Sequence, residues 1–285
     1  MDQAGQAGAA TRHFTLPPGS CDTHCHVFGP PDRFPYAPAR AYEPTDTPKE
    51  TLAALHARLG VDRAVIVQAS AHGTDNRAML DALAWRPDAY RGVAVIDNAI
   101  TDAELEAMAA AGVCGIRFNF VRSLGLWPEP DVFSRSVARA ASLGWHVVLH
   151  VKDDDILTLH ENFAALPVPF VIDHMGRVDP AAGVEQPAFR ALLDLLRRDG
   201  AWVKLSGAER MVPSPYDGAL PYARALVAAR PDRILWGTDY PHPNLKAKVD
   251  ERDLVDLIPA YVADAETRRC MLVDNPARLY GFPAA

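Results

Sequence analysis

The sequence predicts a single-domain (β/α)8 barrel of the TIM type. Eight short apolar runs rich in β-branched residues alternate with amphipathic stretches, which is typical of a parallel sheet covered by helices. A chain of 285 residues suits one large α/β domain better than two small ones. An open doubly wound sheet is the structural alternative. The expected strands are 20–28, 63–70, 90–96, 114–120, 146–151, 170–176, 202–206 and 234–240.

Helix signals lie between several of these strands. Residues 47–50 (TPKE) offer an N-cap threonine followed by a proline at the first helical position, and residues 101–104 (TDAE) form a capping-box pattern. Leu192, Leu195 and Leu196 share one helical face by their spacing. These stretches are therefore expected to pack around the outside of the barrel.

The composition narrows the class of protein. Residues 1–18 are expected to form a flexible N-terminal arm, and residues 19–285 the barrel. The net charge of −7 argues against nucleic-acid binding, and no apolar run is long enough to span a membrane. No secretory signal is visible, and the four cysteines form no CxxC pair, which favours reduced thiols and a cytoplasmic location. The sequence is compatible with a monomer or an oligomer. The cysteines are Cys21, Cys25, Cys114 and Cys270.

Two histidines on the first expected strand could bind a metal. Side chains alternate across a strand, so His24 and His26 should point to one side and Cys25 to the other. Two imidazoles on one face suit a divalent ion such as Zn²⁺. Taken alone, the pair is equally compatible with ordinary polar residues near a strand end.

Other expected strands end in residues that suit the same chemistry. His150 ends the fifth expected strand, His174 closes the sixth and Asp239 closes the eighth. Because the carboxyl ends of barrel strands meet at one face, these side chains should converge. A zinc ion there would activate a water molecule, and Asp239 would take its proton. Without a metal, Asp239 could still activate water while the histidines donate to a carbonyl oxygen.

Cationic residues gather near the same strand ends. Arg117 lies in the fourth expected strand, Arg177 follows the sixth and Arg210 follows the seventh, with Arg122 and Lys152 nearby. A guanidinium group matches a carboxylate, so an acidic protein with arginines at this face should bind a small anionic substrate. Alternatively, the arginines pair with acidic loop residues. Neutral hydrogen bonds could come from Tyr42, Ser70 and His72.

At these residues the chain resembles a known family. The segments are 21–30 (CDTHCHVFGP), 67–70 (VQAS), 72–77 (HGTDNR), 115–119 (GIRFN), 173–177 (DHMGR) and 235–242 (LWGTDYPH). Together they resemble the 2-pyrone-4,6-dicarboxylate lactonase group of the amidohydrolase superfamily, from about residue 19 to residue 282. The resemblance implies a distorted (β/α)8 barrel that hydrolyses a small acidic lactone in bacterial breakdown of aromatic acids.

The resemblance also assigns roles to positions. It implies that the catalytic residues are His24, His26, His174 and Asp239, and that the metal ligands, where zinc is bound, are these four with His150. The implied substrate-binding residues are Tyr42, Ser70, His72, Arg117, Arg177 and Arg210, with His242 near the catalytic aspartate.

Two positions depart from the pyrone-dicarboxylate pattern. The lactonases usually carry tyrosine at the position of His150 and arginine at that of Ser123, and they work without a required metal. The departures bring the chain closer to the related 4-sulfomuconolactone hydrolases, which are associated with zinc. The leading prediction is hydrolysis of 2-pyrone-4,6-dicarboxylate. The alternatives are zinc-dependent hydrolysis of 4-sulfomuconolactone, metal-dependent non-oxidative decarboxylation, and anion binding without turnover.

Overall fold

The structure, a computed structural model, describes residues 13–121 and 127–283. Within them, one eight-stranded parallel sheet runs in the order β1 to β8, so each strand pairs with its neighbours in the sequence. The strands are β1 (Cys21–Cys25), β2 (Arg63–Val67), β3 (Tyr90–Ala94), β4 (Val113–Asn119), β5 (His146–His150), β6 (Phe170–Ile172), β7 (Ala201–Leu205) and β8 (Ile234–Trp236). All eight predicted strands are confirmed.

The sheet closes where β1 meets the chain around β8. Thr23 Oγ1 donates a hydrogen bond to the carbonyl of Trp236 at 2.8 Å, and the Asp239 amide donates to the carbonyl of His24 at 2.7 Å. A bridge between Cys25 and Tyr240 extends the contact. These links join the first strand to the last, so the barrel is confirmed and the open-sheet alternative is wrong.

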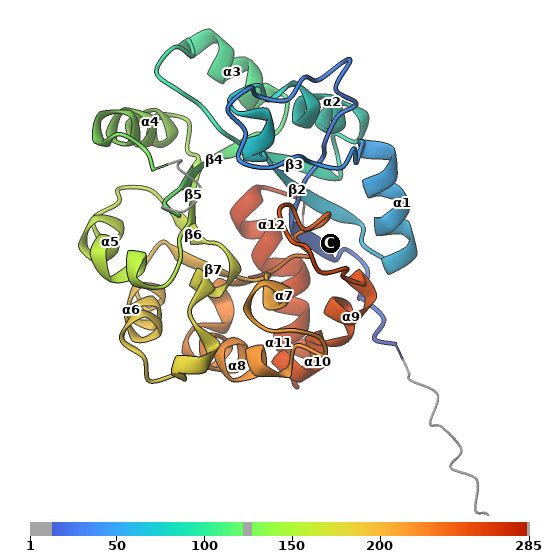
Figure 1. Cartoon of the computed structure of the whole chain (residues 1–285), viewed down its shortest axis with the longest axis vertical. Helices are drawn as coiled ribbons and strands as arrows, with labels where there is room; N and C mark the ends of the chain where they lie inside the picture. Colours follow the sequence, from blue (N-terminus) through green and yellow to red (C-terminus); the bar gives the residue numbers. More distant parts are fainter. Residues whose placement is uncertain (1–12, 122–126, 284–285) are drawn as a thin grey trace, which may run out of the picture.

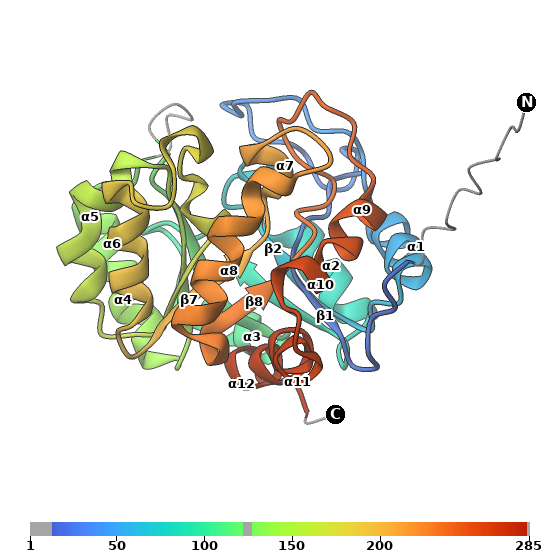
Figure 2. The same cartoon turned by 90° about the horizontal axis from the view of Figure 1, so that it is seen from below.

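Helices surround the barrel (Figure 1). They are α1 (Lys49–Leu59), α2 (Arg77–Trp85), α3 (Asp102–Ala110), α4 (Pro130–Ser142), α5 (Asp154–Ala164), α6 (Pro187–Leu196), α7 (Ala208–Met211), α8 (Leu220–Ala229), α9 (Glu251–Asp256), α10 (Ile258–Tyr261), α11 (Ala265–Arg269) and α12 (Asn275–Tyr280). Figure 2 shows α7 at one end of the barrel and α12 at the opposite end. One end therefore carries the loops that follow the strands, and the C-terminal helix lies against the other.

The predicted helix signals are largely confirmed. The capping box at the start of α3 is present, because Thr101 accepts from the Glu104 amide and Glu104 accepts from the Thr101 amide. The leucine face of α6 is fully buried. At α1 the prediction is off by one residue: Pro48 occupies the N-cap, because the backbone of Thr47 pairs with Phe28.

The barrel interior is apolar towards the amino ends of the strands. Its buried residues there include Cys21, Val65, Val93, Val148, Val171, Trp202 and Leu235. Tyr280 and Phe282, at the end of α12 and just beyond it, pack into the same cluster. The C-terminal segment therefore closes this end, and any opening into the barrel must lie at the carboxyl ends of the strands.

Several strands are shorter than predicted at their carboxyl ends. The expected strands 20–28, 170–176 and 234–240 end instead at residues 25, 172 and 236. The chain then turns through the left-handed region, with φ of 54° at His174 and 62° at Asp239. An extended strand cannot contain such residues, so both side chains lie in turns just past the strands.

The predicted flexible arm is described only from His13 onwards. The Phe14 amide donates to Asp256 at 2.8 Å, and Leu16 is buried in the main core, so the packed region begins before residue 19. Residues 1–12 lie outside the described part. All four cysteines are free thiols, as predicted. Within the described residues, no helix has the length and apolar character needed to cross a bilayer.

Candidate functional site

The acidic centre of the site is Asp239, in the turn after β8. Its Oδ1 atom lies 3.3 Å from Nε2 of His26, 3.6 Å from Nε2 of His24 and 3.9 Å from Nε2 of His174. All four side chains are almost completely buried. The structure thus brings together the four residues predicted to be catalytic, although they come from β1 and from the segments that follow β1, β6 and β8.

Hydrogen bonds on the far side of each ring orient two of these histidines. Nδ1 of His26 lies 2.7 Å from the carbonyl of Val67 and therefore donates to it, since a carbonyl can only accept. Nδ1 of His174 lies 2.9 Å from Oγ of Ser206. Both contacts direct the Nε2 atoms towards Asp239, an arrangement common around catalytic and metal-binding imidazoles.

A buried ionic group lies beneath His24. Asp173 Oδ1 is 3.1 Å from Nδ1 of His24 and 3.3 Å from Nζ of Lys204, and its Oδ2 accepts from Nε of Arg117 at 3.2 Å. Lys204 Nζ is also 3.1 Å from Nδ1 of His24. Asp173, His24 and Lys204 have no exposed surface. The charge of Asp173 is thus balanced inside the barrel, and the ring of His24 is held from below.

Sequence reasoning missed Lys204. It lies on β7 between buried neighbours, and it takes the inward position two residues after Trp202, which packs inside the barrel. A lysine at an inward position of an otherwise apolar strand was the available signal, because such a charge needs a partner.

The three predicted substrate-binding arginines divide into two kinds. Arg210 binds Asp239 Oδ2 through Nε, and Arg117 binds Asp173, so the acidic-partner alternative holds for these two. Arg177 differs, because its Nη1 lies 3.3 Å from Nε2 of His150 and no carboxylate of the described residues pairs with it. Arg177 therefore offers a cation to an incoming anion. Lys152 is exposed; Arg122 and Ser123 lie outside the described residues.

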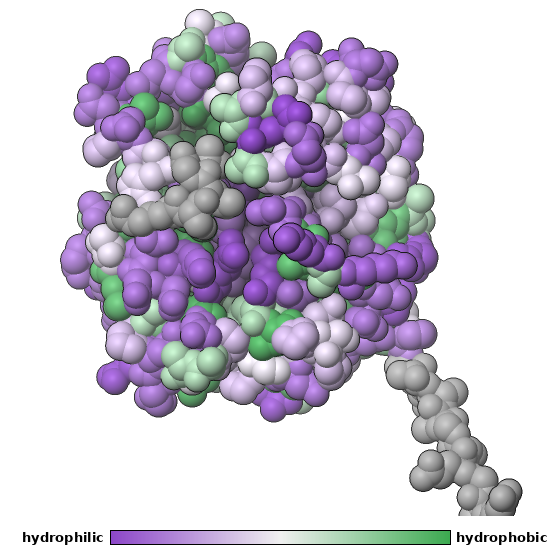
Figure 3. Space-filling model, viewed as in Figure 1, coloured by the Kyte–Doolittle hydropathy of each residue, from purple (hydrophilic) through white to green (hydrophobic). Residues whose placement is uncertain are grey.

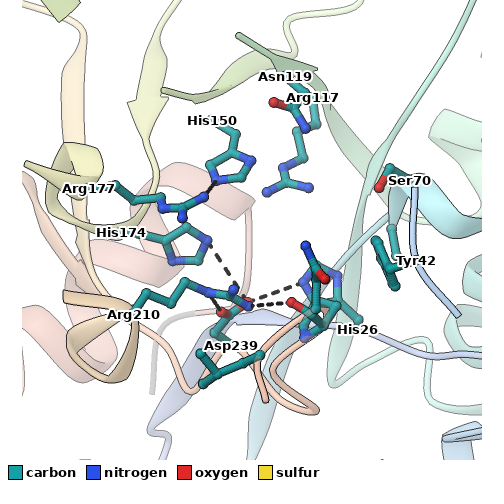
Figure 4. A pocket seen from close by; sticks show the side chains of 14 residues that line it. His26, Tyr42, Ser70, Arg117, Asn119, His150, His174, Arg177, Arg210 and Asp239 are labelled. Atoms are coloured by element: carbon teal, nitrogen blue, oxygen red, sulfur yellow. Dashed lines mark hydrogen bonds and ion pairs between the residues drawn. The ribbon is translucent and has the colours of Figure 1, made fainter. Parts of the chain in front are cut away.

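Most of the predicted site residues line a cavity of about 190 Å³ at the mouth of the barrel. Figure 4 shows their side chains pointing into it, and in Figure 3 hydrophilic residues surround the central hollow. The predicted residues that line it are His26, Tyr42, Ser70, Arg117, His150, His174, Arg177, Arg210 and Asp239. Asn119 and the segment 243–245 also line it and were not predicted. The cavity is small and lined largely by polar groups, so it suits a compact, charged molecule.

Two predicted substrate-binding residues lie away from this lining. His72 stacks beside Phe28 and points Nδ1 at the carbonyl of Pro35, 3.2 Å away. His242 lies between two acids, 3.3 Å from Glu209 and 3.5 Å from Glu251. The glutamates outweigh burial and raise the pKa of His242 to about 9.

The electrostatic environment keeps Asp239 ionised and His24, His150 and His174 neutral. Burial acts to raise the pKa of Asp239, but the Arg210 guanidinium outweighs it and holds that pKa well below its usual value. Burial lowers the pKa of His24 to about 4 and the pKa values of His150 and His174 well below their usual range. Asp239 is therefore unprotonated at neutral pH and can accept a proton, and its lowered pKa makes it a weaker base than an ordinary carboxylate.

The same donor set fits a divalent cation. The candidate ligand atoms of His24, His174 and Asp239 lie within 4.8 Å of one another. His24 Nε2 and Asp239 Oδ1 are buried without a hydrogen-bond partner in the described structure. A neutral His26 would aim an Nε2 lone pair at the carboxylate, an arrangement that a positive charge between them would stabilise. His150, the fifth predicted ligand, directs its Nε2 towards Arg177 instead.

Comparison with known proteins assigns the family. The amidohydrolase family model matches residues 21–282. The chain belongs to the amidohydrolase family. It is 45% identical to a 2-pyrone-4,6-dicarboxylate hydrolase of Comamonas testosteroni, over 96% of this chain and 94% of that one. It is 41% identical to a 4-sulfomuconolactone hydrolase of Hydrogenophaga intermedia, over 94% and 90%. The predicted family and the hydrolase class are therefore confirmed.

The fold of the family is shared as well. A crystal structure of a Pseudomonas putida protein, 33% identical to this chain, superposes with a TM-score of 0.83 over 95% of this chain and 100% of that one. The whole barrel, including the segments that carry the site, is thus common to both proteins.

Proposed function

We propose that the protein hydrolyses a small anionic lactone, with 2-pyrone-4,6-dicarboxylate as the leading substrate. One observation carries the proposal. One small cavity is bordered by the ionised Asp239, by three imidazoles and by Arg177, which pairs with no carboxylate of the described residues. The carboxylate supplies a base, and the arginine supplies a partner for an anionic group. The similarity of the chain to the Comamonas testosteroni hydrolase supports this substrate class.

The geometry supports an order of events. Arg177, assisted by Arg117 and the hydroxyls of Tyr42 and Ser70, holds the acidic groups of the substrate. Asp239 takes a proton from water, whose oxygen attacks the lactone carbonyl carbon. The ring C–O bond then breaks, and Asp239 returns the proton to the leaving oxygen. Arg210 keeps Asp239 aimed into the cavity throughout.

A zinc ion, where bound, would be held by His24, His26, His174 and Asp239 and would supply Lewis acidity to water and the carbonyl. Without it, an imidazole that carries a hydrogen on Nε2 can donate to the carbonyl oxygen as negative charge develops there. His26, whose Nδ1 donates to Val67, can do so only in its protonated form. In either case the protein contributes the orientation of these rings, through Val67, Ser206 and the Asp173–Lys204 pair.

A second candidate substrate is 4-sulfomuconolactone. The observation that favours it is the pair formed by His150 and Arg177, since a histidine at this position is a departure from the pyrone-dicarboxylate lactonases. A sulfonate, like a carboxylate, accepts hydrogen bonds from an arginine in a planar fork. The 41% identity to the Hydrogenophaga intermedia enzyme also supports this candidate.

The deciding experiment is a lactonase assay of the wild-type chain and the Asp239→Asn variant on both substrates, before and after chelation. We expect Asp239→Asn to lose about a hundredfold to ten-thousandfold in turnover while it still binds substrate, because only the proton acceptor is removed. Asp194→Asn, which changes an exposed carboxylate on α6, is the matched control and should keep full activity. Full activity of Asp239→Asn would contradict the mechanism.

The products separate the remaining possibilities. Ring opening without gas release supports lactone hydrolysis, whereas release of CO₂ from an intact ring would indicate a decarboxylase. Tight substrate binding with no turnover, in metal-free and zinc-loaded protein alike, would indicate an anion-binding barrel.

A further inference from the structure

Lys204 is a fully buried cation that the proposed mechanism does not use. It lies inside the barrel on β7, below His24, and its side chain has no exposed surface. A buried ammonium group carries three N–H donors, and each needs an acceptor to offset the loss of water. The acceptors of Lys204 therefore indicate how hydrogen atoms are distributed around it.

Two possible acceptors in the described structure lie within hydrogen-bond distance of Lys204 Nζ. They are Asp173 Oδ1 at 3.3 Å and Nδ1 of His24 at 3.1 Å. If Nδ1 of His24 carried a hydrogen, it would face the ammonium group as one donor against another, and Lys204 would keep Asp173 alone. If Nδ1 carries a lone pair, Lys204 has both acceptors. In that case Asp173 gives up the hydrogen bond from Nδ1 of His24 and still accepts from Arg117 and Lys204.

The opposite side of the His24 ring fits the second arrangement. Nε2 of His24 and Oδ1 of Asp239 are both buried without a hydrogen-bond partner, and they face each other at 3.6 Å. An N–H on Nε2 would point a donor towards this acceptor, whereas a lone pair there would oppose it. The Nε2 side of the ring thus favours a hydrogen on Nε2. On the Nδ1 side, the donor Lys204 and the acceptor Asp173 compete at equal distances of 3.1 Å, and the need of the ammonium group for a second acceptor favours the lone pair.

We propose that Lys204 is a positioning residue that fixes the single ring hydrogen of His24 on Nε2 by donating a hydrogen bond to Nδ1. His24 then presents an N–H to Asp239, which lines the cavity. Asp173 holds the ammonium group in place and balances its charge. Lys204 is not among the residues that line the cavity, so it reaches the cavity only through His24 and through Asp173, which binds Arg117.

The assignment has a consequence for metal binding. An imidazole binds a metal through a lone pair, so His24 can bind zinc through Nε2 only when its hydrogen moves to Nδ1 and is donated to Asp173. Lys204 opposes this shift, and its charge also repels a divalent cation. Lys204 therefore lowers the zinc affinity of the site and favours the metal-free arrangement.

The test reads the hydrogen position directly in the full-length, metal-free protein without substrate. Long-range ¹H–¹⁵N NMR spectra of the histidine rings, with His24→Gln to assign the signals, should show the hydrogen of His24 on Nε2. In Lys204→Met, which keeps an unbranched side chain of similar length, it should move to Nδ1 and be donated to Asp173. A hydrogen on Nδ1 in the wild type, or an unchanged position in Lys204→Met, would overturn the inference.

Zinc titration provides an independent readout. We expect Lys204→Met to bind zinc at least about tenfold more tightly than the wild type, the scale on which second-shell partners act. Arg117→Met is the matched control. This substitution also removes a cation from Asp173, but Arg117 does not contact His24. It should leave the hydrogen on Nε2 and raise zinc affinity less. Equal increases in zinc affinity in the two variants would mean that Lys204 acts only through its charge, which would contradict its positioning role.

The inference rests on His24 belonging to the proposed site. Because the NMR measurement uses no substrate, its result is independent of the lactonase assay. Inactivity towards both lactones would remove the proposed function and leave the hydrogen assignment intact. An unprotonated Nε2 in an active lactonase would remove this inference alone.

Discussion

The two halves of the barrel interior are built from the same strands but have opposite chemistry. On β5, Val148 packs in the apolar half while His150 lines the cavity, and on β6 Val171 packs below while Asp173 binds Lys204. Alternate residues of a strand face the same side, so this change takes place within a single step of two residues. The lower half holds the barrel together, and the upper half can carry buried charges because that support lies directly beneath it.

In the polar half of the barrel interior, nearest the carboxyl ends of the strands, the buried charged residues stabilise the fold only when all of them are present. Asp173 is surrounded by Lys204 and Arg117, and its pKa is held well below its usual value because these two cations outweigh the effect of burial. Removing one member leaves the others charged and unpaired in a dry environment. In the apolar half, by contrast, each residue contributes area and volume without depending on one specific partner.

The largest stability effect should follow from breaking the polar half. Asp173→Leu leaves two buried cations without their carboxylate and should lower the free energy of unfolding by about 3–5 kcal/mol in urea titrations. Adding Lys204→Met should restore part of that loss, because one uncompensated charge disappears. Equal stability of the single and double variants would mean that the two residues do not act as a pair.

A smaller, pH-dependent effect should come from His242. Its folded pKa of about 9 exceeds the unfolded value near 6.5, so its ion pairs stabilise the fold fully below about pH 6.5. That stabilisation is lost as the pH rises through 9. His242→Asn should therefore cost on the order of 2–3 kcal/mol at pH 6 and much less at pH 9.5, as measured by urea unfolding.

The control for this pH dependence is His72→Asn. Burial lowers the pKa of His72, so this residue is neutral in both states above about pH 7. Its variant should differ from the wild type by a constant amount between pH 7.5 and pH 9.5. A His242→Asn cost that stays constant over the same range would contradict the proposed ion pairs.

The smallest effect is expected in the apolar half. Val171→Ala removes two buried methyl groups and should cost about 1–2 kcal/mol at every pH. Chemical denaturation at pH 6 and pH 9.5 checks this. A cost that changes with pH would show that the apolar half is coupled to the ionic group above it.

The sequence predicted the elements of the site better than their local geometry. The spacing of His24 and His26 correctly placed both rings towards Asp239, with Cys25 in the core that faces the helices. Strand alternation alone does not describe this segment, because the register of β1 against β2 shifts between Asp22 and Cys25. A bulge of this kind depends on the neighbouring strand, and single-strand patterns do not contain it.

The turns after the strands and the internal ion pairs were beyond pattern reasoning. His174 and Asp239 adopt positive φ values, which are uncommon even though His and Asp tolerate them better than most residues, and the surrounding structure fixes them. The sequence indicated that the arginines bring positive charge to the site, but not which residues they pair with. Asp173, for example, is 56 residues from Arg117 in the chain. Such pairs exist only once the barrel has closed.

Closure also bears on how the protein is made. Arg63, at the start of β2, donates to the carbonyls of Val273 and Gly19, and Tyr280 seals the end of the barrel beside His146. During translation, the first strands therefore emerge long before the segments that complete them. Until residues 234–282 leave the ribosome, the nascent chain has an unpaired edge at β1 and an open apolar interior. It should depend on chaperones during that interval more than a protein whose contacts form locally.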